Sequence, residues 1–69
     1  MPYVNIKVTH EHGGLTKEQK HELIEGVTDL LSEKLQKNPA STVVVIDEID
    51  TDNYGLGGEQ ITERRKKES

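Results

Sequence analysis

The chain contains no cysteine, and its only aromatic residues are two tyrosines among 69 residues. Without cysteine no disulfide can form, and the sequence has no cluster of cysteine and histidine for a structural zinc ion. Apolar residues make up only 30% of the chain. Chains below about 70–80 residues seldom build a sufficient core alone. Association with further copies is the stabilising device that remains, so we expect a homo-oligomer.

The charge and the short apolar runs exclude two classes of partner. The net charge is −4, with neither a basic stripe nor aromatic residues enough to stack bases, so no nucleic-acid binding is predicted. No apolar run approaches the roughly 20 residues that span a bilayer. The amino terminus, Met-Pro-Tyr-Val-Asn, lacks the regions of a signal peptide. We therefore expect a cytoplasmic protein with no membrane partner.

Periodicity predicts a strand, a helix and a second strand. Residues 3–9 alternate apolar and polar side chains, which predicts a β-strand. Thr16 and Gln19 have capping-box spacing ahead of apolar residues at helical intervals, which predicts a helix that stops at Asn38-Pro39. Residues 41–46 contain the apolar run 43–46, which predicts a strand buried on both faces, as parallel strands usually are. Together these elements form a β-α-β unit.

The carboxyl-terminal part is less regular. Residues 54–59 place three glycines around an aromatic residue, which predicts a tight hairpin or a crossing loop. Residues 60–69 are expected to form a short strand followed by a frayed tail. We thus predict one α+β domain over residues 1–69, with a folded core at 1–62 and a mobile tail at 63–69.

The β-α-β unit cannot cover its own sheet. One helix covers one face of a two-stranded sheet, so the other face stays in contact with water. That face carries either Val43 and Val45 or Val44 and Ile46. Exposed apolar surface of this kind is unfavourable, so another copy of the chain is expected to cover it.

Pro2 is the candidate catalytic residue, because aminopeptidases generally remove an initiator methionine that precedes a small residue. Its nitrogen would then be a secondary amine rather than an amide. A free α-amino group has a pKa of about 7.7–8.0, and desolvation at an apolar contact lowers that pKa. Such an amine is an uncharged base near neutral pH, where base catalysis is most efficient.

Four motifs follow one another along the chain. They are Pro2 before a strand, Glu18-Gln19-Lys20 in the first helical turn, Val44-Val45-Ile46-Asp47-Glu48 at a strand end, and Tyr54-Gly55-Leu56-Gly57-Gly58-Glu59. From Pro2 to about Arg65, this ordered set resembles the 4-oxalocrotonate tautomerase family, also called 2-hydroxymuconate tautomerase. The resemblance implies a β-α-β subunit with a carboxyl-terminal β-hairpin. It also implies four-stranded sheets in dimers, and three dimers in a hexamer.

The resemblance implies an isomerase that moves a proton between oxygen and carbon of 2-hydroxydienoate-like or simple enol substrates. Pro2 corresponds to the general base and acid of the family. Tyr54 corresponds to an aromatic wall residue that is usually phenylalanine, and Ser41 to a serine that lines the site of a neighbouring subunit. No cofactor and no metal ion are implied.

The arginines that bind the family's dicarboxylate substrate are absent. Val43 stands at the strand position, and the loop position falls near His12 or Leu15. Planar carboxylates are bound best by a bidentate guanidinium, so a monocarboxylate or a simple enol is the expected substrate. His12, with His10 beside it after the predicted strand, is one candidate substitute in substrate binding. Arg64, with Arg65 beside it in the expected tail, is the other.

Alternatives to the tautomerase remain. The same proline could act as an acid or water activator in hydration or dehalogenation of an unsaturated acid. A catalytically degenerate oligomeric module is the third possibility. A dimer also remains beside the hexamer, because both cover an exposed sheet face.

Overall fold

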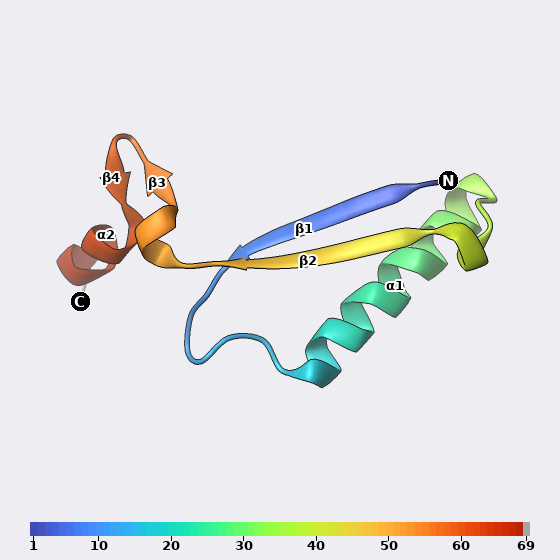
Figure 1. Ribbon diagram of the computed structural model, residues 1–69, viewed down its shortest axis with the longest axis horizontal. Coiled ribbons are helices and arrows are strands. Elements are labelled where there is room, and N and C mark those ends of the chain that lie inside the picture. The colour runs from blue at the N-terminus through green and yellow to red at the C-terminus, as the bar shows by residue number, and fades with distance from the viewer. Residues whose placement is uncertain (69) are drawn as a thin grey trace.

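The computed structural model describes residues 1–68 and confirms the predicted α+β class (Figure 1). Two long parallel strands pack beside one long helix, and a small hairpin with a second helix lies beyond one end of the sheet. In chain order the elements are β1 (Tyr3–Thr9), α1 (Lys17–Leu35), the 3₁₀ turn η1 (Pro39–Ser41), β2 (Val43–Ile49), the 3₁₀ turn η2 (Thr51–Asn53), β3 (Gly55–Leu56), β4 (Glu59–Gln60) and α2 (Ile61–Glu68).

The strands β1 and β2 pair in parallel over their whole length, from Tyr3 opposite Val43 to Thr9 opposite Ile49. The first strand matches its prediction. The second begins two residues later and ends three residues later than the predicted span 41–46. It continues through Asp47 and Glu48 because both carboxylates have partners, which removes the cost of placing charges in a sheet.

The start of α1 follows the capping box that the sequence predicts. The Gln19 amide donates to Thr16 Oγ1 at 3.0 Å, and the Thr16 amide donates to Gln19 Oε1 at 2.9 Å. The helix ends at Leu35, before the predicted stop, because Gln36 takes a left-handed conformation. Asn38 instead caps the turn η1, where its side-chain oxygen accepts from the Ala40 amide.

The helix lies against one face of the sheet, and the other face is bare. Glu48 contacts Lys20 of α1, and Val44 and Ile46 alternate onto that same face. The opposite face therefore carries Tyr3, Val43 and Val45. The sequence did not decide which face would be uncovered, and the structure shows that it is this one. Tyr3 is 65% exposed there.

A buried core is missing from the described part of the single chain, where no apolar side chain is fully buried. The radius of gyration is 15.4 Å, against about 11 Å for a compact chain of this length. Leu30, Leu35 and Leu56 are all more than half exposed. Gly26 of α1 has open space around it, so no backbone within this chain packs closely there. These features agree with a subunit that lacks its neighbours.

Residues 61–68 form helix α2, where the sequence predicted a short strand followed by a tail at 63–69. A hairpin turn at Gly57 and Gly58, both with positive φ, returns the chain as predicted, and the helix follows at once. Contacts to η2 and to Tyr54, the residue that follows it, hold α2: the Ile61 amide donates to the Tyr54 carbonyl at 2.8 Å, and the Thr62 hydroxyl lies 2.6 Å from that of Thr51. Ser69 lies outside the described residues.

The loop from β1 to α1 is fastened to β2 by Glu48. Its Oε1 accepts the Leu15 amide at 2.7 Å, and its Oε2 lies 2.7 Å from Lys20 Nζ. Gly14 passes so close that an added Cβ would lie 2.7 Å from both Glu48 Oε1 and His10 Cε1, and its φ is +88°. The left-handed conformation therefore favours glycine at this position, and an added Cβ would also require the ends of the Glu48 and His10 side chains to shift.

We predict that Gly14→Ala destabilises the protein more than Gly13→Ala. Gly13 has a similar φ of +84° but open space, so alanine there adds only the left-handed strain of roughly 1–2 kcal/mol. Alanine at Gly14 adds a clash, for at least about 1 kcal/mol more. Urea unfolding at one fixed protomer concentration measures both. Equal losses of unfolding free energy in the two variants would show that the Glu48 side chain moves aside without measurable cost.

Candidate functional site

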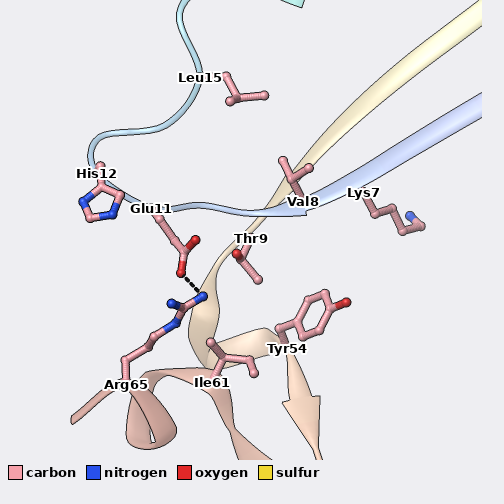
Figure 2. Close-up of a pocket in the computed structure, with 9 residues that line it drawn as sticks. All are labelled: Lys7, Val8, Thr9, Glu11, His12, Leu15, Tyr54, Ile61 and Arg65. Atoms are coloured by element: carbon pink, nitrogen blue, oxygen red, sulfur yellow. Dashed lines mark ion pairs between the residues drawn. The ribbon is translucent and has the colours of Figure 1, made fainter. Parts of the chain in front are cut away.

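A cavity of about 590 Å³ lies where the sheet ends and α2 begins (Figure 2). The end of β1, the following loop, the hairpin and α2 all contribute to it. Its lining residues are Lys7, Val8, Thr9, Glu11, His12, Leu15, Tyr54, Ile61 and Arg65. Segments far apart in the sequence thus meet at one concave surface, which is where ligand sites usually form.

The walls of the cavity are largely apolar. Val8, Leu15 and Ile61 supply aliphatic surface from three different elements, and Tyr54 supplies an aromatic ring. Among the described residues the Tyr54 hydroxyl has no hydrogen-bond partner, and Tyr54 is 41% exposed. Tyr54 thus lies where an apolar planar ligand would find a ring to pack on.

Two cations reach the cavity, and each has a carboxylate partner. Arg65 Nη2 is paired with Glu11 Oε1, both at the cavity rim (Figure 2). Lys7 Nζ lies 3.0 Å from Asp47 Oδ2. The hydrogen bond from Asn5, followed by the one from Lys7, lowers the pKa of Asp47, so this carboxylate stays ionised.

The loop that carries His12 is held in place by Glu48. Hydrogen bonds from Lys20 first, then from the Leu15 amide, lower the pKa of the Glu48 carboxyl. His12 has a φ of +55°, a conformation in which histidine is more tolerated than most residues. With the loop fastened in this way, the His12 ring lies on the cavity rim (Figure 2).

Pro2 lies at the other end of the sheet. Its carbonyl accepts the Val43 amide at 2.9 Å, so Pro2 is aligned with the start of β2, and it is half-buried. Ser41 belongs to the adjacent turn η1 and is half-buried as well. Met1 precedes Pro2 and is 90% exposed.

The predicted site residues thus form two groups within one chain. Pro2 and Ser41 lie at the start of the sheet, and His12 and Tyr54 at its end. Six residues separate Pro2 from Val8, and a rise of about 3.3 Å per residue puts them about 20 Å apart. A small substrate cannot touch both groups in a single chain.

Arg64 lies outside the cavity, where its Nη1 is 3.7 Å from Glu59 Oε1. The cavity receives Arg65 instead, because Arg65 follows Ile61 by four residues on one face of α2. Among the polar lining residues, the sequence reasoning did not select Lys7, Thr9 or Glu11, and it named Arg65 only as the neighbour of Arg64. The spacing of Ile61 and Arg65 was the available signal, but it has meaning only once residues 61–68 are known to be helical.

Metal binding has no support from side-chain clusters. Within residues 1–68, no group of three or more histidine, aspartate or glutamate side chains is placed to hold a metal ion.

Known proteins match this chain along nearly its full length. A family model described as tautomerase enzyme matches residues 2–64. A probable tautomerase from Dickeya dadantii is 59% identical over 69 residues, covering 100% of both chains. The 2-hydroxymuconate tautomerase of Bacillus subtilis is 35% identical, covering 91% of this chain and 97% of its own. The crystal structure of DmpI from Helicobacter pylori has a TM-score of 0.86 at 57% identity, covering 94% of this chain and 97% of its own.

The fold and these matches define a small α+β isomerase built on a β-α-β unit. The chain belongs to the tautomerase family, in agreement with the resemblance seen in its sequence motifs. It is accordingly an enzyme of the tautomerase type. In the described part of the chain, no helix is both long and apolar enough to cross a membrane.

We predict that Tyr54→Phe keeps kcat/KM for phenylenolpyruvate ketonisation within about threefold, whereas Tyr54→Ala lowers it by about tenfold or more. The ring, rather than the hydroxyl, provides the wall, since no hydrogen bond of that hydroxyl is recorded. Steady-state assays on both variants measure the difference. If the phenylalanine variant lost as much as the alanine variant, the hydroxyl itself would take part in binding or chemistry.

Proposed function

We propose that the protein catalyses keto-enol tautomerisation of a 2-hydroxydienoate-like or simple enol substrate, with Pro2 as general base and acid after removal of Met1. The observation that carries the proposal is the position of Pro2. Pro2 follows Met1 directly in the sequence. Its carbonyl accepts a hydrogen bond from the Val43 amide, and the residue is half-buried. Once Met1 is gone, a fixed secondary amine begins the strand.

The proposed reaction needs one group that takes and returns a proton. The Pro2 nitrogen accepts the proton of the enol hydroxyl, which leaves a dienolate. The same nitrogen then gives that proton to carbon, and a conjugated ketone forms. No electron is gained or lost, so no cofactor is required. Desolvation by a neighbouring copy would keep the amine neutral near pH 7.

A second copy would unite the two halves of the site. Each long strand has one unpaired edge, because the sheet order is β1-β2. If two copies join the free edges of β1 in antiparallel fashion, Pro2 of one copy comes to the end of β1 in the other. There it meets the partner's cavity with Tyr54. Such two-fold pairing is the commonest form of homo-oligomer.

The four-stranded sheet of such a dimer would still expose Tyr3, Val43 and Val45 on each subunit. Further association is therefore expected, and we propose the hexamer of three dimers that the family resemblance implies.

In this hexamer Ser41 and His12 would hold substrate oxygens, and Tyr54 would form the apolar wall. Arg64 stays a prediction, since its guanidinium lies on Glu59 in the single chain. We place the enzyme in the cytoplasm, as its sequence suggests.

We predict that protein shown by intact mass to lack Met1 accelerates phenylenolpyruvate ketonisation well above the buffer rate. The rate should fall as the pH is lowered, because the Pro2 amine then becomes protonated and only the neutral amine is a base. Pro2→Ala keeps a free amine but not the ring, and should lower kcat/KM by about tenfold or more. The measurements are mass spectrometry and a pH profile of kcat/KM.

Other results would favour the alternatives. A rate within a few-fold of buffer, from protein that lacks Met1, would support the degenerate oligomeric module. A rate that instead follows the protonated amine, with an unsaturated acid as substrate, would support hydration or dehalogenation.

We predict that Val45→Lys reduces the oligomer to smaller species, because it places a charge on the bare face of the sheet. The wild-type chain should sediment as a hexamer at micromolar concentration. Glu33→Lys, on the exposed surface of α1, is the matched control and should keep the wild-type mass. Analytical ultracentrifugation gives the answer. A Val45→Lys variant of wild-type mass would show that this face is not an interface.

A further inference from the structure

The cavity contains a guanidinium whose partner is replaceable. We propose that Arg65 binds the carboxylate of the substrate, and that Glu11 occupies Arg65 until the substrate carboxylate displaces it. The substrate class would then be an enol that carries one carboxylate. This inference rests on the proposed function for its chemistry, but its binding step can be tested without turnover.

Helix α2 aims Arg65 at the cavity. Ile61 packs into the apolar wall, and Arg65 lies one helical turn further on the same face. The start of α2 is fixed by the Ile61 amide, which donates to the Tyr54 carbonyl at 2.8 Å, and by the contact between Thr62 and Thr51. The guanidinium and the Tyr54 ring therefore belong to one connected unit.

The neighbouring cations are committed elsewhere. Lys7 lies 3.0 Å from Asp47 on the sheet, next to Asn5, which donates to the same carboxylate. Arg64 and Lys67 both contact Glu59 on another side of α2. Arg65 is thus the cation of α2 that lines the cavity, and Glu11 is the carboxylate that lines it.

The Arg65–Glu11 pair is open to exchange. The two side chains are 57% and 31% exposed, and exposed ion pairs contribute little. Glu11 engages one nitrogen, Nη2, while a guanidinium has five N–H donors and binds a carboxylate best through two of them. The Glu11 carbonyl accepts the Gly14 amide at 2.9 Å, so the side chain can turn away while its backbone stays.

Charge favours a monoanion as the incoming group. Lys7 and Asp47 balance each other, so Arg65 and Glu11 decide the charge of the cavity. When Glu11 turns to water, one positive charge is left, and one carboxylate neutralises it. A second carboxylate would find only Lys7 among the lining residues, and would have to compete for it with Asp47, which Asn5 also holds by a hydrogen bond.

The test compares two ligands that bind without reacting, cinnamate and its neutral counterpart cinnamamide. Their binding to the purified oligomer is followed by NMR titration. We expect the wild-type protein to bind cinnamate at least tenfold more tightly than cinnamamide. Because neither ligand is an enol, the result does not depend on Pro2, and a failure of tautomerase activity would leave it unaffected.

Variants assign the effect to residues. Arg65→Ala should abolish the preference for cinnamate and leave cinnamamide binding within about twofold, whereas the control Lys67→Ala, which removes a cation of α2 that contacts Glu59, should keep the preference. Glu11→Gln should tighten cinnamate binding by about threefold to fivefold, because the competing carboxylate is gone. Circular dichroism and sedimentation verify that each variant is folded and assembled.

Two outcomes would overturn the proposal. If Arg65→Ala retained the tenfold preference, another group binds the carboxylate. If Glu11→Gln bound cinnamate no more tightly than the wild type, Glu11 does not compete for Arg65. A Glu11→Gln variant that also lowered KM for phenylenolpyruvate would extend the result to turnover.

Discussion

One helix has to cover a sheet of two strands, and it can cover only one face. The rest of the molecule follows from this constraint. Helix α1 lies on the face that carries Val44 and Ile46, and the face that carries Tyr3, Val43 and Val45 is left bare. With 30% apolar residues and no cysteine, the chain has no internal means to bury that surface. Stability and assembly are therefore coupled in the oligomer that we propose.

The arrangement of the site reflects that same incompleteness. Pro2 and Ser41 lie at the start of the sheet, and Tyr54 and His12 lie at its end, about 20 Å away by strand rise. In the dimer that we propose, β1 contributes to two sites. Its start supplies Pro2 to the partner's cavity, and its end lines the cavity of its own chain. The half that holds the cavity is nonetheless complete in each chain, with a ring, aliphatic walls and a paired guanidinium.

The sequence predicted best what short-range physics decides. The Thr16–Gln19 capping box and the alternation of residues 3–9 involve neighbours in the chain, and both were found as predicted. The end of β2 was missed because the partners of Asp47 and Glu48 lie more than 25 residues away in sequence. Likewise α2 was taken for a tail, since the contacts that hold it come from η2 and not from its own composition.

By itself, the sequence determined the fold class and the family, and it supplied the prediction of further copies and the candidate proline, because each depends on composition, periodicity or motif order. Tertiary structure decided which sheet face is bare, that Arg65 rather than Arg64 lines the cavity, and that Glu11 is its partner. Those facts depend on where α2 docks. Docking is set by contacts between segments far apart in the chain, and no local pattern encodes their outcome.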